Sequence, residues 1–162
     1  MEWLWRAGIL MSYMTLSFQP VGSGQAGELL ALMKQLYDHT GMTWSQPVAL
    51  SSLEELLRCP EKGGAWLIRV DGLAAGYFVL TLAFSLEFGG IFALLDELYI
   101  EPRFRNQSIG EASLRFIEEQ CREFGAAALR LETGIDNPDA VRFYERHGLT
   151  REPRYLMTKR LG

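Results

Sequence analysis

The sequence has few of the residues that cross-link or metallate a small fold. Among its 162 residues are two cysteines, Cys59 and Cys121, and two histidines, His39 and His147. Small secreted domains usually carry more cysteines as disulfides, and zinc sites need Cys and His at short spacings that this sequence lacks. We therefore expect reduced thiols, one of them packed in a core, no metal site, and a cytoplasmic location.

Long basic runs and long apolar runs are also lacking. The net charge is −4, and no cluster of Lys and Arg offers a basic face to nucleic acid. The apolar first 14 residues are interrupted by Arg6 and Gly8, are too short to cross a membrane, and lack the basic start and cleavage site of a signal peptide. We expect no nucleic-acid partner and no membrane association, and treat residues 1–13 as an N-terminal appendage of unknown role.

What the sequence does contain is typical of one soluble globular domain, which we place at residues 14–162. Apolar residues make up 48% and charged residues 22%. The predicted fold is α/β (α+β), with a single mixed, mostly antiparallel central sheet flanked by helices on both faces. Strands are expected at 15–19, 65–70, 73–84, 90–100, 127–132 and 155–159, and helices at 25–39, 52–59, 109–124 and 138–147.

Three local signals support this order of elements. The pair Asp71-Gly72 lies between two apolar runs and predicts a hairpin. Ser52 and Glu55 have the spacing of a capping box, so residues 42–50 are expected to be a loop. Pro138 follows Asn137, the favoured order at a helix start.

The stretch from Asp96 to Gly110 runs from an apolar strand through a turn into a helix. The first N–H groups of a helix lack partners and lie at its positive end, so they attract anions such as a pyrophosphate. Arg103 and Arg105 lie beside them and could pair with phosphate oxygens. Most strand–turn–helix units bind nothing, so this motif alone does not decide the function.

A second stretch, from Asn137 to Gly148, carries Tyr144 on the same helix face as Val141. Tyr144 is either a core tyrosine with its hydroxyl at the rim or a proton donor to a departing thiolate.

Together the two stretches resemble the GCN5-related N-acetyltransferase (GNAT) family. The family's coenzyme loop has Arg or Gln, two residues, Gly, one residue, and Gly or Ala, and Arg105, Ser108 and Gly110 occupy those positions. The resemblance is specific from about Leu95 to Leu149, and its motifs are the strand 97–102, Asn137 and the run 143–149. One departure is Ser108, which stands where the family usually has glycine, as does Asn106 at a position where glycine is frequent. The Ser108 side chain either crowds the pyrophosphate or caps the next helix.

The resemblance implies an acyl-CoA acyltransferase fold with acetyl-CoA as cosubstrate and no metal. Backbone groups of Leu98, Tyr99 and Ile100 would pair with the pantetheine arm as if it were an added strand. Tyr144 would protonate the departing sulfur, and Asn137 would hydrogen-bond the coenzyme from the opposite side. The pyrophosphate would lie on the amides of Arg105, Asn106, Gln107, Ser108, Ile109 and Gly110.

The acceptor amine must lose a proton before it attacks, and Asp96 and Glu97 are the nearby carboxylates. Successive strand residues face opposite ways, so only one of the two would face the acetyl group unless a bulge intervenes. Both could also be solvent-facing or ion-paired, or could bind a cationic substrate.

The sequence therefore predicts an N-acetyltransferase that moves an acetyl group from acetyl-CoA to a primary amine of a small molecule by direct attack in a ternary complex. The alternatives are a non-catalytic coenzyme A-binding sensor or scaffold, which Ser108 favours, and a protein N-acetyltransferase. Residues 40–50 and the tail near Tyr155 are expected to shape the acceptor pocket. A homodimer is left open.

Overall fold

A computed structural model of the chain describes residues 14–161. The chain divides into two compact units, one ending at Arg130 and the other beginning at Leu131. The expected appendage, residues 1–13, lies outside the described residues, and the single domain from residue 14 onward stays a prediction.

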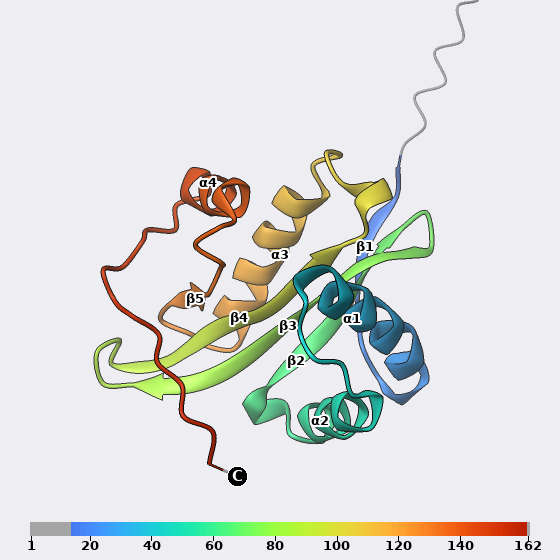
Figure 1. Cartoon of the computed structure of the whole chain (residues 1–162). Coiled ribbons are helices and arrows are strands. Elements are labelled where there is room, and N and C mark those ends of the chain that lie inside the picture. Colours follow the sequence, from blue (N-terminus) through green and yellow to red (C-terminus); the bar gives the residue numbers. More distant parts are fainter. Residues whose placement is uncertain (1–13, 162) are drawn as a thin grey trace, which may run out of the picture. The chain divides into compact units, whose positions relative to one another are not determined.

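The centre of the first unit is an open sheet of five strands in the order β1-β2-β3-β4-β5 (Figure 1). The first four strands are antiparallel neighbours, and β5 follows the helix after β4. The predicted mixed, mostly antiparallel sheet is confirmed. Asp71 and Gly72, with φ of 49° and 81°, form the predicted hairpin turn. The strands are β1 Leu16–Pro20, β2 Gly63–Val70, β3 Leu73–Ser85, β4 Gly90–Ile100 and β5 Leu129–Leu131.

Two helices, α1 Ala26–Thr40 and α2 Gln46–Arg58, cover one face of this sheet. Leu29 and Leu53 from the helices and Leu67 and Tyr77 from the sheet belong to one buried cluster. Helix α1 ends at Gly41 in the left-handed conformation, φ 70°, with its N–H donating to the carbonyl of Tyr37.

The predicted start of α2 at Ser52 is wrong, because the helix begins at Gln46. Ser45 takes the extended conformation of an N-cap residue, and Pro47 lies in the first turn. A proline there gives up an N–H that would have no helical partner anyway, so it starts the helix instead of marking a loop. The loop before α2 is therefore shorter than the predicted 42–50.

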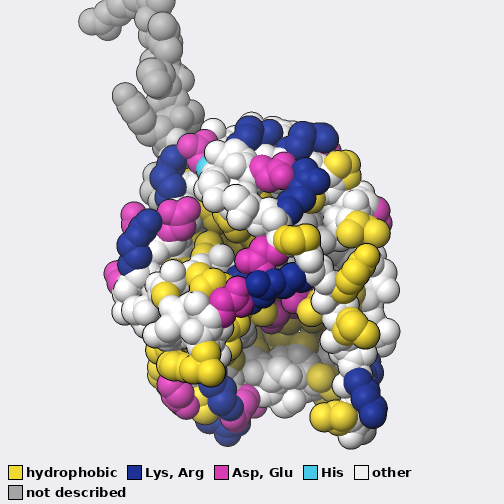
Figure 2. Space-filling model, turned by 90° about the vertical axis from the view of Figure 1, so that its left-hand side faces the viewer, with side chains coloured by type: hydrophobic (Ala, Val, Ile, Leu, Met, Phe, Trp, Pro, Cys, Tyr) yellow, Lys and Arg dark blue, Asp and Glu magenta, His cyan; other side chains and the backbone are white. Residues whose placement is uncertain are grey.

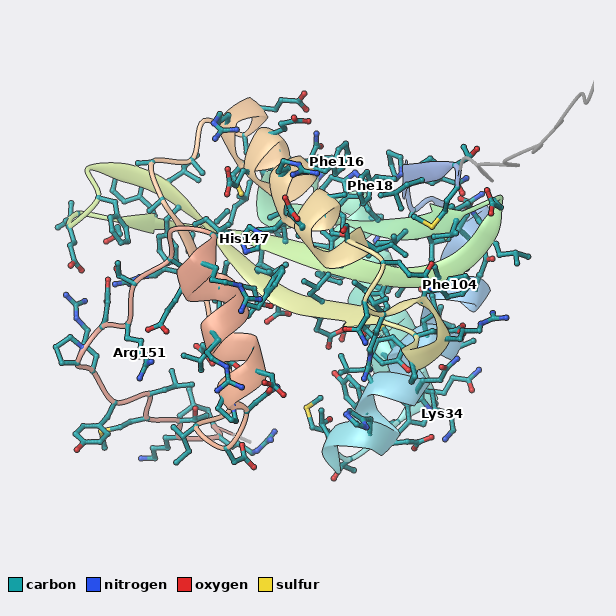
Figure 3. All side chains as sticks on the ribbon, turned by 90° about the horizontal axis from the view of Figure 1, so that it is seen from above. Phe18, Lys34, Phe104, Phe116, His147 and Arg151 are labelled. Atoms are coloured by element: carbon teal, nitrogen blue, oxygen red, sulfur yellow. The ribbon has the colours of Figure 1, made fainter. Side chains whose placement is uncertain are left out.

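Helix α3 Ile109–Glu123 covers the opposite face of the sheet. Its buried stripe includes Ile117 and Cys121, and Phe116 stacks on Phe18 of β1 with ring centroids 4.4 Å apart. Figure 3 shows these two rings on one side of the sheet and Lys34 of α1 on the other. Helices on both faces, and a free thiol of Cys121 in the core, are as predicted.

The second unit contains helix α4 Pro138–Arg146. Asn137 caps it as predicted, because its Oδ1 accepts a hydrogen bond from the amide of Ala140 at 3.2 Å. The predicted strand at 155–159 is wrong. Those residues form no strand, and Tyr155 and Met157 are 97% and 88% exposed. Apolar side chains alone do not make a strand without a neighbouring strand to pair with, and within residues 14–161 none pairs there.

Charged side chains of both signs lie interspersed on the face shown in Figure 2. Many such residues are ion-paired at the surface, for example Lys34 with Asp38 and Arg115 with Glu111, each at 2.6 Å. Among residues 14–161, the structure contains no helix with the length and apolar character that a membrane crossing requires.

Candidate active site

A bulge in β4 brings the two candidate carboxylates together. Val79 of β3 lies opposite Glu97, but the next residue, Leu80, lies opposite Leu95, so Asp96 is an extra residue without a partner on β3. A bulge of this kind interrupts the alternation of side chains. Asp96 and Glu97 consequently line the same cavity, and the simple alternation that would have aimed them apart does not apply.

This cavity has a volume of about 530 Å³ and is bounded by α1, α2, the loop between them, β3 and β4. Thr43, Trp44 and Ser45 line it from the loop, within the segment 40–50 that is expected to shape an acceptor pocket. Its other walls are mostly apolar. They include Met33, Val48, Ala49, Leu53, Leu56, Val79 and Leu82. The volume and the apolar lining are typical of a small-molecule site.

Glu97 is held by two tyrosine hydroxyls. Tyr37 of α1 donates to Oε1 at 3.0 Å, and Tyr77 of β3 donates to Oε2 at 2.7 Å. Burial raises the pKa of Glu97 above its usual value, while the two hydrogen bonds act in the opposite direction. Burial and the nearby carboxylate raise the pKa of Tyr37 to about 12, so its hydroxyl remains a donor at neutral pH.

These two tyrosines were missed by sequence reasoning. Tyr37 lay on the apolar stripe of a helix and Tyr77 within an apolar strand, and neither pattern indicates a hydroxyl with a specific partner. Asp96 has no such donors; partial burial raises the pKa of its carboxyl. Glu97 is thus the fixed carboxylate of the pair, and Asp96 the more exposed one.

The loop after β4 presents backbone amides at the start of α3. Asn106 and Ser108 both have φ of 60°, in the left-handed region, and Gln107 between them does not. Alternating conformations of this kind turn successive N–H groups toward one point and make an anion-binding nest. The first N–H groups of α3 continue this row of donors. The side chain of Ser108 makes no capping hydrogen bond, so the capping interpretation is wrong.

The two arginines of this loop are already engaged. Arg105 Nε donates to the carbonyl of Ile100 at 2.8 Å, and its guanidinium lies 5.8 Å from the centre of the Tyr99 ring. Arg103 pairs with Glu101 at 2.7 Å and lies over the ring of Phe104, which is labelled in Figure 3. Both arginines thereby brace the loop.

Near the end of β4, some backbone N–H and C=O groups point away from β3. Gly76 lies opposite Ile100, and the hydrogen bond runs from the amide of Glu101 to the carbonyl of Ala75. This pattern identifies Ile100 as a non-hydrogen-bonded position, so its N–H and C=O point outward, as do those of Leu98 two residues earlier. The backbone of Tyr99 instead faces Tyr77. Of the three predicted residues, Leu98 has an outward N–H and C=O available to an added strand, and Ile100 has an outward N–H, since its carbonyl already accepts from Arg105.

The sequence pattern of the acetyltransferase (GNAT) family matches residues 31–149, which include the cavity, the bulge and the nest. The chain belongs to this family.

Several GNAT relatives and solved structures are similar to it. An aminoalkylphosphonate N-acetyltransferase from Salmonella typhimurium is 34% identical over 91 residues, which are 56% of this chain and 58% of that protein. A putative ribosomal protein bS18-alanine N-acetyltransferase from Bacillus subtilis is 32% identical over 88 residues, 51% of each chain. The chain thus spans little more than half the length of the curated relatives it matches.

Among solved structures, an integron cassette protein from the mobile metagenome of Cole Harbour Salt Marsh superposes with a TM-score of 0.79 at 30% identity, over 90% of each chain. The aminoglycoside N-acetyltransferase AAC(6′)-Iy in complex with CoA also gives 0.79, at 15% identity, over 91% of this chain and 95% of that one. The second likeness shows the fold alone.

The geometry of this GNAT chain fits the cosubstrate that its family uses, acetyl-CoA. The nest at 106–108 supplies amides that suit a pyrophosphate, and Leu98 and Ile100 supply outward backbone groups that suit the amides of a pantetheine arm. Residues 14–161 contain no group of three or more His, Cys, Asp and Glu side chains arranged to hold a metal ion.

Asn137 and Tyr144 belong to the second unit, and their predicted roles stay predictions. The Oδ1 of Asn137 is engaged in capping α4, which leaves its amide nitrogen as the group that could donate to a coenzyme. Tyr144 lies on α4 with its ring centroid 5.2 Å from that of Phe143, and its carbonyl accepts from the amides of His147 and Leu149.

Proposed function

We propose that this protein is an N-acetyltransferase that moves an acetyl group from acetyl-CoA to a primary amine of a small molecule, by direct attack in a ternary complex. One observation carries the proposal. The bulge at Asp96 puts two carboxylates into a small-molecule cavity, immediately before the outward-facing backbone of Leu98 and Ile100. An acceptor beside Glu97 and a cosubstrate along the next residues of the same strand would meet there.

Acetyl-CoA would supply an activated acyl group on a thiol leaving group. Backbone groups of Leu98 and Ile100 would align its pantetheine arm, and the amides from Arg105 to Gly110 would hold its pyrophosphate. Since these contacts come from the backbone, they orient the cosubstrate without requiring a particular side chain. Asn137 would add a hydrogen bond from α4.

Glu97 is proposed as the general base. An alkylamine is mostly protonated at neutral pH and must lose a proton to become a nucleophile. Burial moves the pKa of Glu97 upward, in the direction of neutral pH. This suits a group that accepts the proton directly or through one water. The hydroxyls of Tyr37 and Tyr77 fix its two oxygens, and Asp96 would attract the cationic amine to the same end of the cavity.

Tyr144 is proposed to donate a proton to the departing sulfur, so that the leaving group departs as a thiol and not as a thiolate. The relatives named above support a small amine as the acceptor, since one of them is an aminoalkylphosphonate N-acetyltransferase. The bS18-alanine relative keeps a protein N-terminus as a second candidate. The free thiols of Cys59 and Cys121 favour a reducing compartment such as the cytoplasm.

A panel of small amines, one protein N-terminal peptide and acetyl-CoA tests the proposal. Free thiol is followed in a colour reaction, and the acetylated amine is identified by mass. We expect amine-dependent thiol release with equal amounts of acetylated product. Tight binding of coenzyme A without acetyl transfer to any acceptor would instead identify a coenzyme sensor or scaffold.

A further inference from the structure

We infer that the acceptor is a monoamine with an apolar body, aliphatic or aromatic, and not a polyamine. The inference rests on the proposed function and concerns the cavity bounded by α1, α2, β3 and β4. It follows from how positively and negatively charged side chains are distributed over the walls of that cavity.

The charged residues at the α2 side of the cavity are paired with one another and together carry one net positive charge. Lys62 Nζ lies 2.6 Å from Glu55 Oε1, and Arg58 lies 2.8 Å from Glu55 Oε2. Both oxygens of Glu55 are therefore occupied by cations, and the ammonium of Lys62 is occupied by Glu55. This side of the cavity therefore has no unpaired Glu55 oxygen for a second ammonium group, and its net positive charge would repel one.

The charge at the β4 side is different. Asp96 and Glu97 are two carboxylates side by side, and Glu97 is bonded by neutral tyrosine hydroxyls, not by a cation. The negative charge that can attract an ammonium group is therefore gathered at this one end of the cavity. No second site of the same kind lies on the cavity walls within the described residues.

The surfaces between the two charged ends are mostly apolar. Trp44 packs edge-on against Tyr37, with ring centroids 5.4 Å apart, and both face the cavity. The floor includes Leu53 and Val79, only 5% and 7% exposed, which belong to the buried core. A hydrocarbon body gains affinity from such walls, whereas a second ammonium placed there would lose its hydration without a partner.

A homologous series of amines measures this directly. Burial of one methylene corresponds to about a fourfold gain in affinity. We expect kcat/KM to rise about fourfold per carbon from propylamine to hexylamine, and 2-phenylethylamine to be a good acceptor. The matched pair is hexylamine and 1,5-diaminopentane, in which a terminal methyl is replaced by a second ammonium. The diamine should be at least about tenfold worse.

Trp44→Ala should reduce the rise in kcat/KM along the amine series to about twofold per carbon, because one apolar wall of the cavity is removed. Trp44→Phe, which keeps an aromatic wall, should restore most of the slope. The slope within one variant is independent of any general loss of activity. Lys34→Ala, at an exposed ion pair on the outer side of α1, serves as the matched surface control.

A flat series in the wild-type chain, or a diamine better than hexylamine, would overturn the inference while the proposed function stands. If no amine is acetylated, the proposed function fails, and calorimetric titration of the full chain with hexylamine and with 1,5-diaminopentane still decides the inference. Tighter binding of hexylamine would support it, and no binding of hexylamine, or tighter binding of the diamine, would overturn it.

Discussion

The loop after β4, residues 101–110, and the cavity beside Asp96 and Glu97 follow each other closely along the chain but are built in different ways. The loop presents backbone amides, oriented by the left-handed conformations of Asn106 and Ser108. The cavity presents side-chain carboxylates, fixed by the hydroxyls of Tyr37 and Tyr77. One site depends on backbone dihedral angles and the other on particular functional groups.

This difference explains how the chain departs from its family. A backbone site tolerates a change of side chain as long as the new residue can adopt the required φ, so Ser108 can replace a glycine at a conformational cost. A side-chain site has no such freedom, since removing one hydroxyl or one charge removes an interaction that nothing else supplies. Substitutions should accordingly have graded effects in the loop and large effects in the cavity.

The largest effect is expected from Glu97→Gln, which keeps the shape of the proposed base and removes its charge. General base catalysis typically contributes on the order of 10²–10⁴-fold, so kcat should fall by about 100-fold or more at neutral pH. Activity should partly recover at higher pH, where more of the amine is unprotonated. Steady-state kinetics across pH with a single small amine provides the measurement.

The matched control is Asp96→Asn, one residue earlier on the bulge. If Asp96 mainly attracts the cationic amine, its amide variant should raise KM and leave kcat nearly intact. Equal, small effects from both variants would mean that neither carboxylate is the base.

Ser108→Pro should have the next largest effect, on coenzyme affinity. Proline holds φ near −65° and has no N–H, whereas Ser108 has φ of 60°. A backbone clash of about 3 kcal/mol corresponds to roughly a 100-fold weaker Kd for coenzyme A by calorimetry. Far-UV circular dichroism checks that the helices are intact; wild-type affinity in a folded variant would remove the nest from the coenzyme site.

Much of the fold could be predicted from the sequence because its signals are local. The Asp71-Gly72 turn, the cap at Asn137 and the buried stripe of α3 each depend on residues within one element. Two of the predicted elements were wrong. Pro47 was interpreted as part of a loop although it starts α2, and the apolar run after Pro153 was interpreted as a strand although the structure shows none there.

The candidate site was predictable only in part. Asp96 and Glu97 stood out as carboxylates at the end of an apolar strand. The bulge at Asp96, opposite Val79 and Leu80, results from the pairing of two strands, and no Gly or Pro at this point of the sequence indicates it. Likewise, Tyr37 reaches Glu97 across 60 positions of sequence. In the sequence, Asn106 and Ser108 stood out only because the family usually has glycine at these positions. Their φ values of 60° show why glycine suits these positions.

A moderate effect on pH dependence is expected from Tyr77→Phe. Its hydroxyl lowers the pKa of Glu97 relative to burial alone, so removing it should raise that pKa further. The basic form of Glu97 is then lost at a higher pH, and the acid limb of the kcat/KM profile should move upward. Tyr37→Phe should move it less, because the hydrogen bond from Tyr37 is longer and Tyr37 is less buried than Tyr77.

Tyr99→Phe is the control for these two variants, since Tyr99 donates to Gln35 at 3.1 Å and not to Glu97. An acid limb that stays in place in all three variants would show that the tyrosines do not tune the base. The profiles are to be recorded at saturating acetyl-CoA, so that only the acceptor step is compared.

The smallest effect, and one of opposite sign, is expected from Ser108→Gly. A non-glycine residue in the left-handed region costs about 1–2 kcal/mol, part of which glycine gives back through the greater freedom of the unfolded chain. The variant should therefore gain up to about 1 kcal/mol in the free energy of unfolding, measured in urea, and bind coenzyme A at least as tightly as the wild type. Asn106→Gly should gain less, because asparagine tolerates this conformation better than serine does. Weaker coenzyme binding in Ser108→Gly, with stability unchanged or higher, would mean that the hydroxyl itself contacts the phosphates. In that case the loop, like the cavity, would depend on a functional group and not on φ alone.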